Sequence, residues 1–333
     1  MRKKQAIIKN FDFYIDEFMY YCRSKRLRPK TMQSYEQALR LFERWCFEEE
    51  KINEPAQVTE QTMRRYICSL EDRGKYTFYA IEDRKDTNYP ERRRDFEQPI
   101  SVVTINSYIR YLKVFFTWYS YNHNRVNPMQ NIRQLKMERQ AKEFLEDHEI
   151  HKLMQIFDKS YFPEHRDSVI ITLLLDSGMR LGECLQIKVE DVDIVERTIM
   201  LPAENTKGRK TRCVFFSVKT ARALRQWLRY KDRYTSSPLL FPVKAGTPLS
   251  VHTFDTNFKH YLARAGISKK VSPHALRNNF AKRCLMNGMD IYTLSRILGH
   301  SSVAVTEKAY LDIEDRDLRH RYENFSPIEN LRR

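Results

Sequence analysis

The chain has 333 residues, with 59 Lys and Arg against 43 Asp and Glu, and its formal net charge is +16. At about 100–200 residues per domain, this length predicts two domains, each able to bury its own core. No apolar run approaches the roughly 20 residues of a membrane span, and the six cysteines contain no C-x-x-C pair, so a membrane protein and a zinc site are not expected.

The positive charge is spread over the whole chain. Residues 1–140 hold 27 basic and 19 acidic residues and residues 141–333 hold 32 and 24, a net charge of +8 for each part. Both parts could therefore attract the phosphate backbone of a nucleic acid. A basic protein without such a partner is the alternative that charge alone leaves open.

The first part of the sequence is helical in pattern. Apolar residues recur at helical spacing in two stretches between Phe11 and Glu50, where Pro29 stands just before the second helix and Thr31 fits its start. Further helices are predicted over residues 59–70 and 103–121. The charged stretch 74–99 between them predicts a loop or flexible insertion. We expect residues 1–126 to form one helical domain.

The polar stretch 127–143 is typical of a linker, and the pattern after it is mixed. Two β-rich runs, residues 197–201 and 212–216, flank a basic tip that contains Gly208, which predicts a β-hairpin. Helices are predicted over residues 146–157, 166–176, 218–234, 251–265, 273–287, 291–298 and 303–311. The fold class expected is therefore mainly α with a small antiparallel β-sheet.

Two short segments could bind a phosphate, although each also has an ordinary structural explanation. Arg180 and Glu183 follow a helix stop at Gly178 and share a helical face, as a surface ion pair beside a capping glycine would. Pro273 opens a helix and places His274 and Arg277 on its first turns, where they could hold a phosphate or form a plain polar face.

Three further residues are ambiguous when taken alone. His300 sits in a tight corner between Gly299 and the next helix, and could be a buried structural histidine or a donor to a ligand. Tyr310 on that next helix and Lys207 at the hairpin tip have nothing local that distinguishes them.

Together, in chain order, these residues resemble the tyrosine recombinase (phage integrase) family. The resemblance rests on residues 177–183, on 274–277, and on 298–302 followed by Thr306 and Tyr310, and it extends to 21–25 and 30–35 in the first part. It implies a helical, SAM-like core-binding domain over residues 1–126 that binds DNA, with the insertion at 74–99. A linker over 127–143 and an α+β catalytic domain over 144–333 follow.

Cleaving a DNA phosphodiester without a metal requires a positive clamp, a nucleophile and proton transfer. Arg180 and Arg277 can bind the nonbridging oxygens and stabilise the charge that develops on them. Tyr310 would be the nucleophile, and because its ordinary pKa is about 10, it needs a proton acceptor, for which His274 is the candidate.

The resemblance implies roles for three supporting residues and no cofactor. Lys207 would protonate the departing 5′-oxygen, His300 would donate to the phosphate, and Glu183 would orient Arg180 or His274. The phosphotyrosyl product keeps the energy of the phosphodiester, so neither ATP nor a metal is implied. Further DNA contacts are expected from basic side chains in both parts, namely Arg28, Lys30, Arg133, Lys136, Arg209 and Lys210.

The function that the resemblance implies is site-specific recombination for integration or excision of a mobile element. The expected partners are double-stranded DNA recombination sites, three further copies of the chain in a tetramer with the tail at 312–333 docked on a neighbour, and an accessory directionality factor. We expect a cytoplasmic, DNA-associated protein with no membrane contact. The alternatives are relaxation of supercoils by a type IB topoisomerase and a catalytically silent DNA-binding protein of the same fold.

Overall fold

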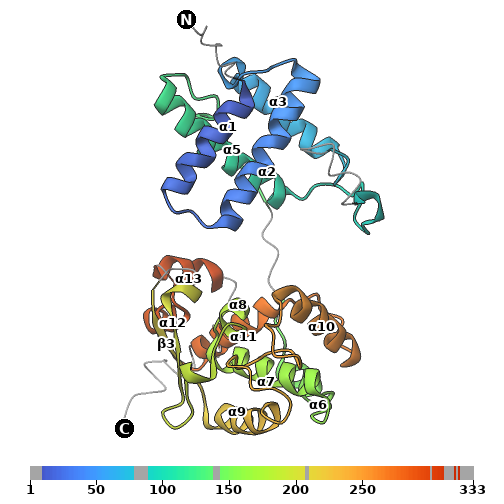
Figure 1. Ribbon diagram of the computed structural model, residues 1–333, viewed down its shortest axis with the longest axis vertical. Coiled ribbons are helices and arrows are strands. Elements are labelled where there is room, and N and C mark those ends of the chain that lie inside the picture. The colour runs from blue at the N-terminus through green and yellow to red at the C-terminus, as the bar shows by residue number, and fades with distance from the viewer. Residues whose placement is uncertain are drawn as a thin grey trace, which may run out of the picture. The chain divides into compact units, whose positions relative to one another are not determined.

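The computed structural model describes residues 10–78, 89–137, 143–206, 210–300, 302–310, 319 and 322. The chain divides into two compact units, Met1–Arg139 and Gln140–Arg333 (Figure 1). The fold class is confirmed, because the described chain is mainly helical and its strands form one small antiparallel sheet. None of the described helices combines the length and the apolar character needed to cross a membrane.

The first unit is helical, and its helices begin where the sequence offers a start signal. Asn10 caps the first helix by accepting a hydrogen bond from the Phe13 N–H (3.1 Å), and Thr59 caps the third in the same way. Pro29 is itself the first residue of the second helix, because its fixed φ suits that position. The described helices are α1 (Phe11–Ser24), α2 (Pro29–Trp45), α3 (Glu60–Asp72) and α5 (Val102–His123), with single turns at Cys46–Glu50, Pro55–Gln57 and Pro90–Arg92.

Aromatic side chains fill the core of this unit. The ring of Phe42 meets the rings of Tyr66 at 4.8 Å and Phe116 at 5.9 Å, both edge to face, and Phe18 meets Phe115 at 5.4 Å. All five are fully buried. Edge-to-face pairs of this kind add to the stabilisation from burial alone, so the apolar faces of four helices form one rigid core.

The chain does not leave the first unit at residue 126. Met129 and Ile132 are buried in its core, and the Asn106 side chain accepts from the Leu135 N–H (2.7 Å) and donates to the Leu135 carbonyl (3.0 Å). The first half of the stretch expected to be a linker therefore packs as part of this unit.

The expected insertion is closed at its base. Gly74 pairs with Pro99 in an antiparallel bridge, and the Arg93 guanidinium lies over the Tyr76 ring, 4.6 Å from its centre. Residues 79–88 lie outside the described residues. The described ends of the insertion are therefore held together by backbone pairing and a cation–π contact.

The second unit is built around α7 (Phe162–Ser177), which is buried on nearly every side and packs against α9 and α11. Its fully buried Asp167 accepts hydrogen bonds from Asn257 (3.0 Å) and Tyr261 (2.9 Å). The other helices of this unit are α6 (Asp147–Gln155), α8 (Leu181–Cys184), α9 (Val218–Lys231), α10 (Val251–Arg264), α11 (Pro273–Met286), α12 (Ile291–Leu298) and α13 (Val303–Tyr310), with single turns at Val189–Asp191 and Ala203–Asn205.

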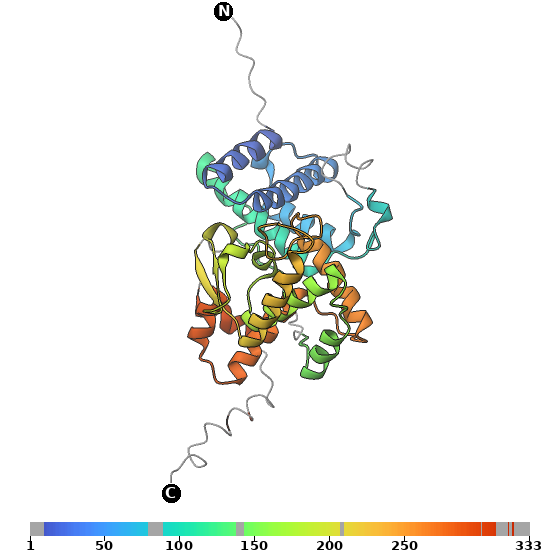
Figure 2. The ribbon, with the colours of Figure 1, turned by 60° about the horizontal axis from the view of Figure 1, so that its bottom comes forward.

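The predicted hairpin is present as β2 (Thr198–Leu201) and β3 (Arg212–Phe215), and β1 (Val192–Asp193) adds a short third strand that the sequence pattern did not indicate. The pairing is antiparallel, with Leu201 opposite Arg212. In both ribbon views the sheet lies beside α12 (Figures 1 and 2). The hairpin is thereby positioned next to the segment that leads into His300.

Candidate active site

A sharp turn after α7 brings Arg180 into the site. Gly178 ends the helix with φ +64°, a conformation that strains other residues, and a Cβ at this position would lie 2.3 Å from the Phe280 ring. The Gly178 carbonyl accepts a hydrogen bond from Nη1 of Arg277 (2.8 Å). The predicted helix stop is confirmed, and the same turn joins the two arginine segments.

Glu183 holds Arg180 at the start of α8. The Arg180 Nη1 donates to Oε1 (2.8 Å) and its backbone N–H donates to Oε2 (3.0 Å). The Glu183 side chain is 3% exposed, whereas that of Arg180 is 26% exposed and so faces a space that a ligand can reach. Burial alone would raise the pKa of Glu183, but the hydrogen bonds and charge of Arg212, followed by the hydrogen bonds of Arg180, hold that pKa below its usual value.

Arg277 is anchored from three directions. It lies on α11 and is 2% exposed, and besides Gly178 it donates from Nη2 to the Leu298 carbonyl (2.8 Å) and to Nε2 of His300 (2.9 Å). His274, one turn earlier on the same helix, is exposed. The Arg277 guanidinium is therefore held in one position, where it adds a permanent positive charge close to Gly178 and His300.

His300 is a neutral acceptor in this arrangement. Its Nε2 accepts from Arg277, so its one N–H is on Nδ1 and donates to Oγ1 of Thr306 (2.6 Å). Burial, and then the charge of Arg277, lower the pKa of His300 to about 4. Both ring nitrogens are therefore already engaged in hydrogen bonds, and the donation from His300 to the phosphate stays a prediction.

The neutral, half-buried state of His300 predicts a specific pH dependence of folding. The unfolded chain binds a proton at His300 below about pH 6.5, whereas the folded chain does so only near pH 4. The free energy of unfolding therefore falls as the pH is lowered from about 6.5 to about 4, and below that the contribution of His300 is constant. Denaturation midpoints measured between pH 7 and pH 4 should fall less for His300→Asn than for the wild type. His260→Asn, at an exposed position on α10, is the control, and its midpoint should depend on pH as that of the wild type does. If the midpoint of His300→Asn also kept the wild-type pH dependence, the neutral state assigned to His300 would be wrong.

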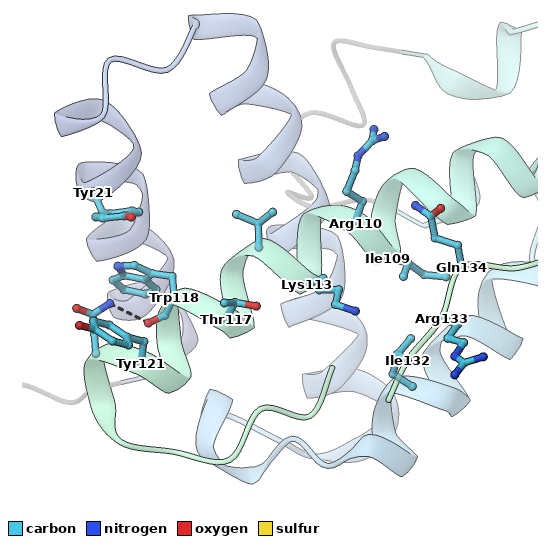
Figure 3. A pocket seen from close by; sticks show the side chains of 12 residues that line it. Tyr21, Ile109, Arg110, Lys113, Thr117, Trp118, Tyr121, Ile132, Arg133 and Gln134 are labelled. Carbon is cyan, nitrogen blue, oxygen red and sulfur yellow. Dashed lines mark hydrogen bonds between the residues drawn. The ribbon is translucent and has the colours of Figure 1, made fainter. Parts of the chain in front are cut away.

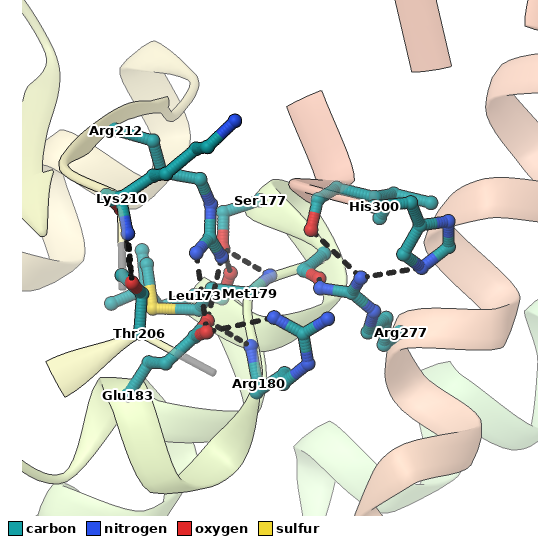
Figure 4. A network of polar contacts seen from close by, with 12 residues as sticks. Leu173, Ser177, Met179, Arg180, Glu183, Thr206, Lys210, Arg212, Arg277 and His300 are labelled. Carbon is teal, nitrogen blue, oxygen red and sulfur yellow. Dashed lines mark hydrogen bonds and ion pairs between the residues drawn. The ribbon is translucent and has the colours of Figure 1, made fainter. Parts of the chain in front are cut away.

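The cationic groups converge on one place in the second unit. After burial, the pKa of His300 is lowered by the charges of Arg277, Arg180, Arg212 and His274, so all four lie within electrostatic reach of one imidazole. Figure 4 shows the guanidinium groups of Arg180 and Arg277 in the same region, with Glu183 and Arg212 on one side and His300 on the other. Two of the guanidinium groups, those of Arg180 and Arg212, pair with the one carboxylate of Glu183, and Arg277 adds a third positive charge, so this is an anion-binding site.

Several predicted residues fall outside what the structure describes. Lys207 and Arg209 lie at the hairpin tip, outside the described residues. The helix α13 ends at Tyr310, but the side chain of Tyr310 is likewise outside the description. Within the tail at 312–333, Arg319 and Tyr322 are described, and both are helical and exposed. Their predicted roles stay predictions.

Arg212 belongs to this site although it was not among the predicted residues. It donates to both oxygens of Glu183, from Nη1 to Oε1 (3.1 Å) and from Nη2 to Oε2 (2.6 Å). A signal was present in the sequence, because Arg212 alternates with Val214 of its strand and with Phe216 just after it, both of which are buried. A charge in register with buried positions requires a partner.

A second surface, on the first unit, carries one of the predicted DNA contacts. Arg133 lines an open groove of about 780 Å³, together with Arg110 and Lys113 of α5, which the sequence analysis missed. Figure 3 shows aromatic side chains at one end of this groove, among them Trp118 and Tyr121, and basic side chains toward the other. The remaining described candidates are exposed but do not line the groove: Arg28, Lys30, Lys136 and, in the second unit, Lys210.

Comparisons with known proteins find relatives for both units of the chain. Residues 143–316 match the model of the phage integrase family, and residues 15–80 match the N-terminal SAM-like domain of phage integrases. The tyrosine recombinase XerC of Thermodesulfovibrio yellowstonii is 28% identical over 278 residues, covering 80% of this chain and 90% of the relative. XerA of Pyrococcus furiosus is 30% identical over 234 residues, with coverages of 69% and 77%.

Among solved structures, the Tn1549 transposon integrase in complex with a circular intermediate DNA has the same fold. The two share 16% identity with a TM-score of 0.69, covering 94% of this chain and 99% of that one. The family match spans more than half of the sequence and includes every residue of the anion-binding site described above. The chain therefore belongs to the phage integrase family and is a tyrosine recombinase, an enzyme that cleaves and rejoins DNA strands.

Proposed function

We propose that this recombinase cleaves DNA at specific sites through a 3′-phosphotyrosyl intermediate, and that it integrates or excises a mobile element. The observation that carries the proposal is the convergence of Arg180 and Arg277 on one anion-binding site. From this site, His300 and Thr306 lead into α13, the helix that ends at Tyr310.

The two arginines would bind the scissile phosphate. Arg180 is the accessible partner, and Arg277 supplies a buried charge that cannot move away. Because both are fixed before DNA arrives, they can stabilise the extra negative charge of the pentavalent transition state without reorganising. His300, neutral and hydrogen-bonded to Arg277, would position that arginine rather than contact the phosphate.

Cleavage is a transesterification in which each proton has a place to go. The Tyr310 oxygen attacks phosphorus, the bond to the 5′-oxygen breaks, and the phenolic proton passes to His274. Lys207 would give a proton to the departing 5′-oxygen. The 5′-hydroxyl of another strand then attacks the phosphotyrosyl bond and restores Tyr310, so the bond energy is conserved and ATP is not consumed.

The first unit would act as the DNA-binding core domain. Support for this comes from its groove, which Arg110, Lys113 and Arg133 line toward one end and the exposed rings of Tyr21 and Tyr121 at the other. Guanidinium and ammonium groups neutralise the phosphates of a DNA duplex and release its counterions. Exchange between two duplexes requires four cleavages, which favours a tetramer on double-stranded recombination sites. We further propose that the tail at 312–333 docks on a neighbouring copy and that an accessory factor sets the direction of recombination.

The test is covalent capture on nicked duplexes that cover the DNA flanking the gene. A nick just beyond the cleavage point lets the short fragment with the free 5′-hydroxyl diffuse away, so a phosphotyrosyl adduct should accumulate and its position should map the site. Binding without any adduct would contradict the proposal and leave a silent DNA-binding protein. With an adduct in hand, strand exchange between two marked duplexes, rather than relaxation of supercoils alone, distinguishes a recombinase from a type IB topoisomerase.

A further inference from the structure

Arg212 stands at the start of β3 and points into the second unit. Its side chain is 12% exposed, and its guanidinium forms a two-pronged contact with the Glu183 carboxylate at 3.1 and 2.6 Å. The opposite residue in the sheet is Leu201, which is 1% exposed. The two terminal nitrogens of the guanidinium are therefore held by the carboxylate, in a largely buried place.

Arg212 changes what Glu183 can offer to Arg180. A carboxylate accepts about four hydrogen bonds, and here two come from Arg212 and two from the side chain and backbone of Arg180. With Arg212 present, Arg180 donates to Glu183 from one side-chain nitrogen, Nη1. Without Arg212, the carboxylate could turn and take Arg180 in a two-pronged pair, which would draw the guanidinium away from a phosphate and cancel its charge.

The same side chain packs against the corner that carries His300. Gly299 ends α12 with φ +64°, and a Cβ built there would lie 2.9 Å from Cδ, 3.0 Å from Nε and 3.2 Å from Cζ of Arg212. The charge of Arg212 is also one of those that lower the pKa of His300. Arg212 thus contacts both halves of the site, the Arg180–Glu183 pair and the segment that holds His300 against Arg277 (Figure 4).

We propose that Arg212 is a positioning residue for DNA cleavage: by occupying Glu183, it keeps the charge and direction of Arg180 available to the scissile phosphate. This rests on the proposed function of the site. A positioning role differs from a purely structural role of the Arg212–Glu183 ion pair in what it affects. A structural arginine would change the stability of the protein and leave the cleavage rate of the folded enzyme intact.

The test compares single-turnover cleavage by the full chain, with protein in saturating excess over the nicked duplex. Arg212→Lys keeps the charge but replaces the fork with a single ammonium, and its cleavage rate should fall roughly 10²-fold with DNA affinity unchanged, since a misplaced clamp costs about that much. Arg225→Lys, at an exposed position on α9, is the matched control and should cleave like the wild type. If Arg212→Lys does not fold, Arg212→Gln, whose amide still donates to Glu183, carries the same comparison.

A double-mutant cycle with Glu183→Gln shows the route of action. If Arg212 acts through Glu183, adding Arg212→Lys to Glu183→Gln should slow cleavage much less than it slows the wild type. A rate within about twofold of the wild type for folded Arg212→Lys, or a full, multiplicative loss in the double variant, would overturn the inference. An absent adduct with the wild-type chain would instead overturn the proposed function itself.

Discussion

The covalent adduct on a nicked duplex should disappear in Tyr310→Phe, while DNA binding stays at the wild-type level. The substitution removes one oxygen, the atom proposed to attack phosphorus, and leaves the ring and the charge of the site unchanged. Trapping assays on denaturing gels report the adduct, and gel-shift titrations report the binding.

Tyr292→Phe is the matched control for this experiment, because Tyr292 is an exposed tyrosine on the neighbouring helix α12. Its adduct should form at the wild-type rate. Adduct formation by Tyr310→Phe would show that another residue is the nucleophile, whereas loss of DNA binding in that variant would point to a structural role for the hydroxyl.

Arg277→Lys is expected to slow cleavage by roughly 10²–10³-fold, the range seen when one preorganised donor to a transition-state oxyanion is lost. It should also destabilise the second unit. The Gly178 and Leu298 carbonyls and the His300 imidazole all accept from the two terminal nitrogens of Arg277, and one ammonium cannot reach all three. Each buried acceptor left without a donor costs about 1–3 kcal/mol.

Arg264→Lys provides the comparison for this second large effect. Arg264 also donates to a backbone carbonyl, that of Ile156 (2.9 Å), and pairs with Glu164, but its side chain is 36% exposed and lies on α10. Cleavage rates and denaturation midpoints of this variant should stay near those of the wild type. If both variants lost activity equally, the loss would follow from disruption of the unit and not from the phosphate clamp.

The hydrogen bonds around His300 connect the clamp to the helix that carries Tyr310. Arg277 donates to the imidazole, which donates to Thr306, and Thr306 is fully buried on α13, four residues before Tyr310. Four residues are about one helical turn, so the segment that leads to the proposed nucleophile is tied to the same buried guanidinium. A neutral His300 serves this purpose, because a protonated ring could not accept from Arg277.

The sequence alone was sufficient for most of the helices, for the β-hairpin and for the family. Helix ends followed local chemistry at Thr59 and Gly178, and the β-hairpin followed from its two β-rich runs. These features depend on neighbours within a few residues, which a pattern can register. The two-residue strand β1 was missed because it is too short to show any periodicity and exists only through its pairing with β2.

Contacts between distant segments could not be predicted in the same way. The packing of residues 129–135 into the first unit depends on Asn106, about 29 positions away in the chain. The role of His300 as an acceptor depends on which nitrogen meets Arg277, and no sequence pattern contains that information. Arg212 had a weak signal, a charge in register with Val214 and Phe216, but its partner Glu183 is 29 residues earlier.

The sequence by itself therefore determined which residue types are available for phosphate chemistry and in what order, because motif spacing and local turn signals are properties of the chain. The tertiary structure decided how the charges are divided: which arginine is exposed, which is buried, and which carboxylate and imidazole hold them. Burial and hydrogen-bond direction set the protonation of Glu183 and His300, and both arise only when segments far apart in the chain exclude water from the same small volume.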